Sequence, residues 1–423
     1  MQKIPAVVLG FCGSNAIFPP PGPTAVPFKP GADPLVSSSP AAMRPILLKG
    51  HERCVPRPRS RPREPPTPRR RARGSFFFSP VRPGSLRRAI PDRPSLRTAA
   101  DRDCSRDCLS PRPLTFIKYN KEGDLLFTCA KDHHPTLWYS DDGHRVGTYI
   151  GHNGAVWTCD VSEDSKTLVT GSADTTCKMW DTETGTCYFT HQFEQPVRAV
   201  ALAQGDQHMV ISTDPFMGVP AALHIVDVAA NREEQTNDIK ISMSGPEGRI
   251  NRALWGPLNT TILTGGEDGV IRLWDVETGK ILHEASDHKK QIQHLSLSLD
   301  KTHFISASLD KTAKLFDSTT MECLKTYAAD RPVNAAIMSP ILEHIILGGG
   351  QDAMAVTTTS SKAGKFDSKI FYKIYEEEIG GIRGHFGPIN ALAWHPDGRS
   401  FTSGGEDGYA RIHHFDNDYF RIK

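Results

Sequence analysis

The chain has 423 residues, of which 38% are hydrophobic, so it is long and apolar enough to bury a sizeable core. It contains no run of about 18 apolar residues, which argues against a transmembrane helix. Its nine cysteines are scattered and odd in number, which favours free thiols in a reducing compartment over a disulfide framework.

The formal charge of +2 conceals a strongly basic segment near the start of the chain. Residues 54–112 contain 16 Arg, no Lys and five acidic residues, a net charge of +11, whereas residues 43–53 and 113–423 together carry −10. The segment is rich in Pro, Arg and Ser and has too few apolar side chains to offset the entropy of ordering. We predict that residues 1–42 form a disordered extension and that residues 54–112 form a disordered insert.

From residue 113 to the end, the chain repeats a turn that ends in Asp, with a Trp or a substitute six residues later. The pairs are Asp132 and Trp138, Asp174 and Trp180, Asp268 and Trp274, Asp310 and Phe316, Asp352 and Thr358, and Asp407 and His413. Asp214 opens a degenerate unit, which makes seven. His152, His288 and His385 each lie 22 residues before their Asp. This period and pattern are typical of a four-stranded propeller blade, so we predict an all-β, seven-bladed WD-repeat β-propeller.

A propeller removes exposed strand edges by closing its ring. The last unit ends its third strand near residues 411–415, and little chain remains after it. The apolar run 44–48 is therefore expected to supply the fourth strand of the last blade, and residues 43–53 would hold this closing strand and the first Gly-His turn.

The repeated polar residues predict a structural hydrogen-bond network within each blade. In the second unit, the Trp180 indole would donate to a hydroxyl of Thr170 or Ser172, the hydroxyl to His152, and His152 to Asp174. His51, Asp132 and Trp138 would form the matching set in the first unit. The fourth unit has Pro246 in place of His, and the fifth and seventh units have Phe316 and His413 in place of Trp. We expect those blades to be held more by packing than by the network.

A Ser, His and Asp set also raises the possibility of a hydrolase. Here the same set recurs around a ring at fixed spacing, which favours the structural role. The run 308–311 resembles a Ser-x-x-Lys motif but is the turn of the fifth unit, and Gly279-Lys280 lacks the rest of a phosphate-binding loop. Cys104 and Cys108 are two thiols where a zinc site needs four ligands. We therefore predict no catalytic residue, cofactor or metal site.

Several runs are more specific than a generic blade, and through them the chain resembles the family of subunit i of the eukaryotic translation initiation factor three complex. They are residues 43–53, 119–127, 315–320, 347–351, 356–359, 376–378, 384–390 and 403–408. The resemblance covers residues 43–53 and 113–423. His51 lies 81 residues before Asp132, and removing residues 54–112 restores the family's spacing of 22. We interpret residues 54–112 as a retained intron or a gene-model error, with a genuine Arg-rich regulatory arm as the alternative.

The resemblance implies a non-catalytic, cytoplasmic scaffold that contacts subunits b and g of the factor on 43S and 48S preinitiation complexes. Such a subunit would support recruitment of mRNA to the 40S ribosome. Three alternatives stay open. A signalling WD-repeat scaffold of the kinase-receptor-associated type shares the fold, residues 54–112 could bind RNA through their charge, and an enzyme would need an activity that depends on Ser172.

Overall fold

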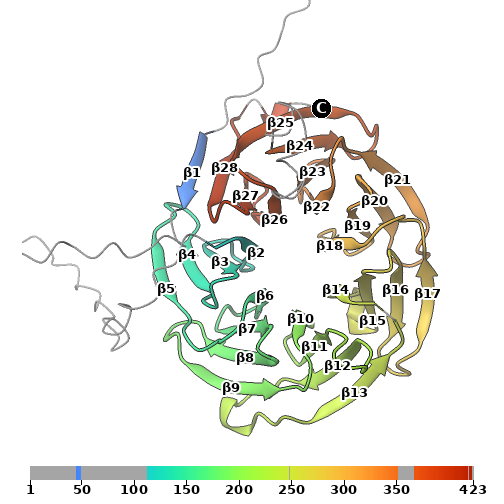
Figure 1. Cartoon of the computed structure of the whole chain (residues 1–423). Helices are drawn as coiled ribbons and strands as arrows, with labels where there is room; N and C mark the ends of the chain where they lie inside the picture. The colour runs from blue at the N-terminus through green and yellow to red at the C-terminus, as the bar shows by residue number, and fades with distance from the viewer. Residues whose placement is uncertain (1–43, 49–111, 247, 351–365, 418, 422–423) are drawn as a thin grey trace, which may run out of the picture. The chain divides into compact units, whose positions relative to one another are not determined.

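The computed structural model describes residues 44–48, 112–246, 248–350, 366–417 and 419–421. The residues of the ring belong to one compact unit, Ala41–Lys423. Seven four-stranded antiparallel sheets are arranged as the blades of a ring, which confirms the predicted seven-bladed β-propeller (Figure 1). The predicted segments 1–42 and 54–111, as well as His51, Asp352 and Thr358, lie outside the described residues.

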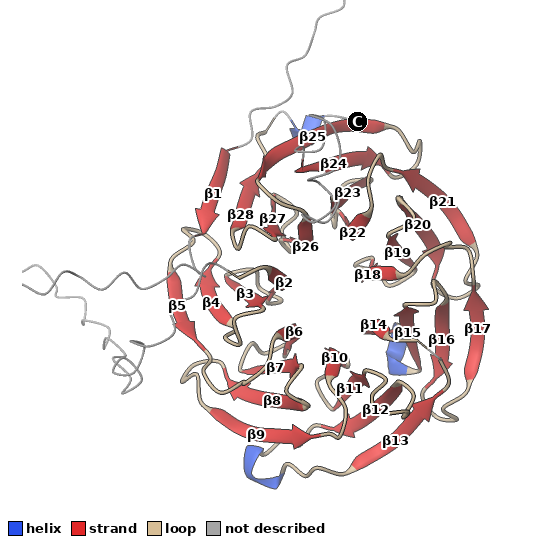
Figure 2. Ribbon diagram, viewed as in Figure 1, coloured by secondary structure: helices blue, strands red, loops and turns tan. Residues whose placement is uncertain are grey.

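In blades 1 to 6 the four strands follow one another as a meander whose first strand is innermost, and blade 7 takes its outer strand from the start of the chain (Figure 2). Blade 1 contains β2 (Leu114–Tyr119), β3 (Leu125–Ala130), β4 (Thr136–Tyr139) and β5 (Arg145–Thr148), and blade 2 contains β6 (Val156–Val161), β7 (Thr167–Ser172), β8 (Thr176–Asp181) and β9 (Cys187–Gln192). Blade 3 contains β10 (Val197–Leu202), β11 (His208–Thr213), β12 (Ala222–Asp227) and β13 (Ile239–Ser244), and blade 4 contains β14 (Ile250–Trp255), β15 (Thr261–Gly266), β16 (Ile271–Asp275) and β17 (Ile281–Ala285). The degenerate third unit therefore forms a complete blade.

The remaining three blades complete the ring. Blade 5 contains β18 (Ile292–Leu297), β19 (His303–Ser308), β20 (Thr312–Asp317) and β21 (Cys323–Ala328), and blade 6 contains β22 (Val333–Met338), β23 (His344–Gly349), β24 (Phe366–Tyr372) and β25 (Glu378–His385). Blade 7 contains β26 (Ile389–Trp394), β27 (Ser400–Gly405), β28 (Ala410–His414) and β1 (Arg44–Leu48). β1 pairs with β28 in antiparallel register, with Ile46 opposite Ile412, at the position expected for the closing strand.

Short 3-10 helices occur at η2 (Arg232–Glu234), η3 (Pro257–Asn259) and η4 (Tyr419–Arg421). Among the residues that the structure describes, none of the helices is long and apolar enough to cross a membrane.

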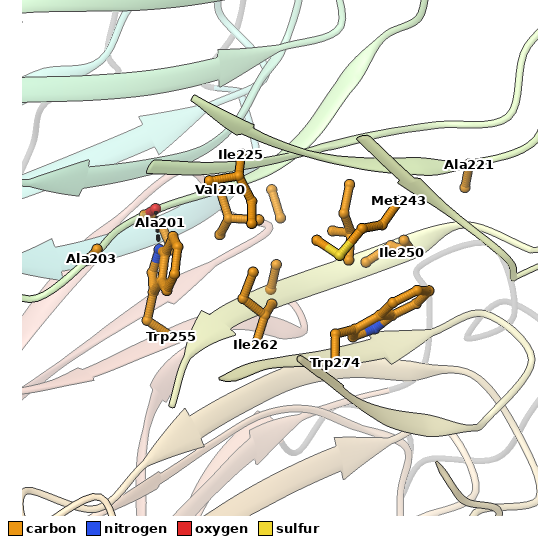
Figure 3. Packing of buried hydrophobic residues seen from close by; sticks show 13 residues of the cluster. Ala201, Ala203, Val210, Ala221, Ile225, Met243, Ile250, Trp255, Ile262 and Trp274 are labelled. Carbon is orange, nitrogen blue, oxygen red and sulfur yellow. Dashed lines mark hydrogen bonds between the residues drawn. The ribbon is translucent and has the colours of Figure 1, made fainter. Parts of the chain in front are cut away.

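The core lies between neighbouring blades. Because a second strand such as β7 is covered on both faces, it is almost continuously buried, whereas an outer strand such as β17 is mostly exposed. Between blades 3 and 4, Trp255 packs in a cluster with Val210, Ile225 and Ile262, and its indole donates to the Ala201 carbonyl at 2.9 Å (Figure 3). Burial of this aromatic and aliphatic surface is the main force that holds adjacent blades together.

Glycine lets the blades approach closely where the second strand meets the next blade. A Cβ at Gly171 would lie 2.8 Å from a methyl group of Val197, and one at Gly404 would lie 2.6 Å from a methyl group of Ile117. Both positions precede the last residue of a second strand, so the repeat places a small residue at the blade interface.

One face of the ring carries the turns that matter for the site. His152, His288 and His385 lie where the chain passes from an outer strand to the next inner strand, and each contacts the turn between the second and third strands. Both kinds of connection therefore share one face, which we call the Gly-His face.

Candidate functional site

The network of blade 2 is complete in the structure. Trp180 Nε1 donates to Thr170 Oγ1 at 2.8 Å, and the Thr170 hydroxyl lies 2.7 Å from His152 Nε2. His152 Nδ1 lies 2.9 Å from an Asp174 carboxylate oxygen. The hydroxyl in the chain is therefore that of Thr170, while Ser172 donates to the Gly154 carbonyl at 3.1 Å.

Asp174 terminates this chain at the turn between β7 and β8. Burial by itself would raise the pKa of Asp174, but hydrogen bonds from His152, Thr176 and the Asn153 amide outweigh it and hold the pKa well below its usual range. The carboxylate is therefore ionised at neutral pH and fixes both the Gly-His turn and its own turn.

Blade 5 keeps the polar part of the network without the indole. His288 contacts Asp310 at 2.9 Å and the Ser306 hydroxyl at 2.6 Å. Phe316 stacks on Phe304, with their ring centroids 5.1 Å apart. Burial by itself would raise the pKa of Asp310, but hydrogen bonds from Thr312 and His288 lower it to about 2. Phe316 at the Trp position is held by packing, while the contacts of His288 with Asp310 and Ser306 remain.

Blade 7 keeps a full network through His413, which differs from our expectation for this blade. His385 contacts Asp407 at 3.1 Å and Ser403 Oγ at 2.8 Å, and His413 Nε2 lies 2.9 Å from the same hydroxyl. Burial lowers the pKa of His413 to about 3, so its imidazole is neutral. The N–H of a neutral imidazole can donate to the hydroxyl as an indole N–H does. The sequence analysis missed this equivalence because it treated His413 only as the loss of a Trp.

Blades 1 and 4 keep the contact between the Trp indole and the hydroxyl. Asp132 accepts from the His134 amide at 3.2 Å, and Trp138 donates to Thr128 at 2.9 Å, while the predicted partner His51 lies outside the described residues. In blade 4, Trp274 donates to Thr264 at 2.9 Å, and Asp268 pairs with Arg272 at 2.6 Å instead of a histidine. Both blades therefore keep the indole–hydroxyl contact, and in blade 4 the partner of the aspartate is an arginine.

The hydroxyl beside each of the three histidines is sealed inside its blade. Thr170, Ser306 and Ser403 have no exposed surface. A nucleophile must reach its substrate, so these residues are arranged to hold turns together and not to attack a bound molecule. The described part of the chain contains no cluster of three or more His, Cys, Asp or Glu side chains suited to a metal ion.

A second set of polar contacts, which the sequence analysis missed, joins four pairs of neighbouring blades. The residue after the first apolar residue of an inner strand bonds to the first main-chain carbonyl of the next inner strand. The donor side chains and the acceptor carbonyls are Thr115 and Val156 (2.6 Å), Asn251 and Ile292 (2.6 Å), Asn334 and Ile389 (3.1 Å), and Asn390 and Leu114 (3.2 Å). Their common position one residue after the first apolar residue was the available signal.

Blades 2 and 3 use a different contact at this position. Arg198 lies over the Trp157 ring, 4.2 Å from its centroid, and makes two-pronged hydrogen bonds to Asp214 at 2.7–3.1 Å. Asp214 is the aspartate of the degenerate unit, so a cation from the inner strand replaces the histidine there.

Arg252 connects blades that are not neighbours. Its guanidinium lies 3.9 Å from the centroid of the Phe116 ring in blade 1, and its Nη1 donates to Thr158 of blade 2 at 3.2 Å. Burial lowers the pKa of Arg252 to about 10, so the side chain stays charged at neutral pH.

The ring of seven blades and the repeated His, Asp, hydroxyl and Trp contacts define a WD-repeat β-propeller. The family model EIF3I matches residues 110–423. The chain is 52% identical over 313 residues to "Eukaryotic translation initiation factor 3 subunit I" of Drosophila ananassae, which covers 73% of this chain and 97% of that protein. The proteins of the same name from Drosophila mojavensis and Drosophila melanogaster are 51% and 50% identical over 313 residues and are covered to 97% and 95%. The chain belongs to the family of eukaryotic translation initiation factor 3 subunit I.

Proposed function

We propose that this chain is a non-catalytic scaffold subunit of the eukaryotic translation initiation factor 3 complex. It acts in the cytoplasm on 43S and 48S preinitiation complexes and supports recruitment of mRNA to the 40S ribosome through contacts with other subunits, b and g among them. The observation that carries the proposal is the family match over residues 110–423, which span all the described strands except β1.

The geometry of the networks supports a binding role. The side chains that resemble a catalytic set are the same ones that hold the turns of blades 2, 5 and 7, and their hydroxyls are buried. A rigid ring with its polar side chains engaged internally offers its loops and blade edges to partners. Fold alone does not name those partners, so the subunit assignment comes from the family.

The test is co-purification of the full chain with the C-terminal segment of subunit b. We expect a complex that forms without nucleotide and survives a chelator, because a passive scaffold uses neither for binding. A requirement for nucleotide or a divalent cation would contradict the passive scaffold. Failure to bind subunit b, together with recovery of a kinase receptor in its place, would favour the signalling scaffold.

The alternative that residues 54–112 bind RNA is tested by deleting them, and RNA binding that survives the deletion would contradict it. The proposal expects subunit b to bind equally to the full chain and to a variant without residues 54–112. Loss of subunit b binding in that variant would instead place the function in the basic segment.

A further inference from the structure

Three basic side chains come from the innermost strands of three blades. Lys118 is on β2, Arg198 is on β10 and Arg252 is on β14, and these strands lie around the centre of the ring (Figure 1). Asp160 raises the pKa of Lys118, and the charge of Arg252 opposes that rise. Burial lowers the pKa of Arg252, and the charge of Arg198 acts in the same direction. Arg252 is therefore close enough to repel both of the other cations.

Two of these cations have a carboxylate of their own. Lys118 Nζ lies 3.1 Å from a carboxylate oxygen of Asp160, which also accepts two main-chain amides at 2.9 and 3.0 Å. Arg198 makes its two-pronged hydrogen bonds to Asp214. Both carboxylates are therefore already paired, and the charge of Arg252 is the one that they do not balance.

Arg252 also has an unsatisfied donor, although it is only 9% exposed. In the described part of the chain its guanidinium makes one hydrogen bond, from Nη1 to Thr158, and its Nε is buried without any partner. One face of the guanidinium lies on the Phe116 ring, 3.9 Å from the centroid, which leaves the edge between Nε and Nη2 unused. A buried donor without an acceptor is costly, and more so on a charged group. This edge therefore calls for an acceptor that the described residues do not supply.

Two titratable side chains near Arg252 are neutral at pH 7. The His294 ring lies 6.4 Å from the Phe116 ring, centroid to centroid, and its Nδ1 lies 3.1 Å from the Ala336 carbonyl oxygen. Burial, together with the charge of Arg252, lowers the pKa of His294 to about 3. Burial raises the pKa of the Cys129 thiol well above its usual value. Neither side chain therefore balances the charge of Arg252.

The chemistry of the unused edge fits an oxyanion. The N–H groups of Nε and Nη2 point in parallel and match two oxygens of one anion. Lys118 adds a second cation, and its side chain is 44% exposed although it is on an innermost strand, so solvent reaches it. A phosphate group carries up to two negative charges near neutral pH and has three oxygens to share. It therefore suits a site with two cations better than a carboxylate does.

We propose that Arg252 and Lys118 form a binding site for a phosphate group among the innermost strands of the ring. Two phosphate oxygens would accept from Nε and Nη2 of Arg252, and a third from Nζ of Lys118, which would keep its contact with Asp160. The group would belong to the free phosphate ion or to a small phosphate ester, because both present the same oxygens. Once bound, it would join β2 of blade 1 to β14 of blade 4. The inference goes beyond the proposed function, which assigns no small ligand to the ring.

The test measures binding of inorganic phosphate to the full chain by isothermal titration calorimetry, in a buffer free of phosphate and sulfate. We expect saturable binding. Arg252→Met keeps an unbranched side chain without charge and should weaken the binding by about tenfold or more, because two charge-assisted hydrogen bonds are lost. Arg252→Lys keeps the charge without the two-donor edge and should weaken it less. The 16 Arg of residues 54–112 add a background that all variants share, so differences between variants report on the site.

Two further variants keep the test independent of the folding of Arg252→Met. Lys118→Met removes the half-exposed second cation and should also weaken phosphate binding, by a smaller factor than Arg252→Met. The matched control is Arg383→Met, since the Arg383 side chain is 72% exposed on the outer strand β25 and should not affect binding. Thermal unfolding gives a second readout, because a ligand that binds only the folded chain stabilises it. Phosphate should raise the melting temperature of the full chain and of Arg383→Met more than that of Lys118→Met.

Two results would overturn the proposal. One is the lack of saturable phosphate binding by the full chain, which would leave Arg252 with its protein contacts alone. The other is equal affinity in the full chain, Arg252→Met and Lys118→Met, which would place the ion elsewhere.

Competition with glycerol 2-phosphate separates the two sources of the phosphate group. Tighter binding than that of inorganic phosphate would identify an ester as the ligand, and weaker binding would identify the free ion. Capture of subunit b, measured separately, keeps failure of this inference distinct from failure of the proposed function.

Discussion

Asp174 is the acceptor on which four hydrogen bonds of blade 2 converge, from His152, the Asn153 amide, and the amide and hydroxyl of Thr176. Asp174→Ala leaves these donors without their acceptor, so we expect a loss of about 2–3 kcal/mol in the free energy of unfolding. Urea unfolding followed by circular dichroism measures it. Asp141→Ala, at an exposed position, is the control and should change little. An unchanged midpoint for Asp174→Ala would refute the structural role of the network.

His413 makes the stability of blade 7 depend on pH. Its pKa is lowered to about 3 in the folded chain and is about 6.5 when unfolded, so the unfolded state takes up the proton first as pH falls. Stability is therefore fully present above about pH 6.5 and declines as pH falls toward 3.

We expect His413→Trp to reduce this decline, because an indole does not titrate and can donate to the Ser403 hydroxyl as it does in blades 1, 2 and 4. Between pH 6.5 and 5, the loss of unfolding free energy should shrink by roughly 2 kcal/mol. Urea midpoints at pH 7.5 and 5.0 measure the difference. Equal pH slopes for the two proteins would contradict a neutral, buried His413.

At the scale of elements, the chain after β28 packs back on blade 6. Tyr419 in η4 is buried, stacks on Phe415 with ring centroids 3.9 Å apart, and hydrogen-bonds through its hydroxyl to His344 Nδ1 of β23 at 2.7 Å. The segment therefore ties blade 7 to blade 6, a role that the sequence analysis did not foresee because it placed little weight on the chain after residue 415.

Removing the contacts of Tyr419 should destabilise the ring, and a larger truncation of the side chain should cost more. Tyr419→Phe should cost about 1 kcal/mol by unpairing His344, and Tyr419→Ala about 3–5 kcal/mol by emptying the space that the ring fills. Tyr375→Phe is the control, since that ring is 71% exposed. Thermal or urea unfolding of the three variants checks the order. A Tyr419→Ala variant as stable as the control would show that η4 does not support the blades.

At the scale of the whole molecule, the ring is closed by β1, which is far from β28 in sequence but is its sheet neighbour (Figure 2). Deleting residues 1–48 removes β1 and bares the edge of β28, so we expect lower stability and aggregation through unpaired main-chain groups. Deleting residues 1–42 leaves β1 in place and should have little effect. Light scattering and unfolding curves compare the two. A monomeric, equally stable chain without residues 1–48 would refute closure by β1.

The segment between β1 and β2 should act on this closure through chain entropy. Deleting residues 54–112 shortens the connection from about 65 residues to a few, which should raise the free energy of unfolding by about 2 kcal/mol, since loop entropy grows only with the logarithm of length. A higher melting temperature than that of the full chain is the expected result. A lower one would mean that the segment contributes contacts of its own.

The sequence by itself determined the architecture, because the signals are local. The distance of 22 residues from His152 to Asp174 spans one Gly-His turn and two strands, so the pairing lies within one blade and survives as a repeat. The same holds for Trp180 and Thr170, which face each other across a single hairpin. Seven repeated turns and a spare apolar run at residues 44–48 were enough to predict a closed ring.

The tertiary structure decided what happens between blades. Trp157 meets Arg198 and Tyr419 meets His344 only because the ring brings neighbouring blades together, and Arg252 meets Phe116 of a blade that is not its neighbour. No spacing along the chain marks those contacts. The replacement of Trp by His413 was likewise visible as a departure, but whether it broke or kept the network depended on the position of its Nε2 atom. The contacts within a turn are made by residues that are close together in the sequence. Packing between blades depends instead on the shapes of two surfaces whose residues are far apart in the sequence.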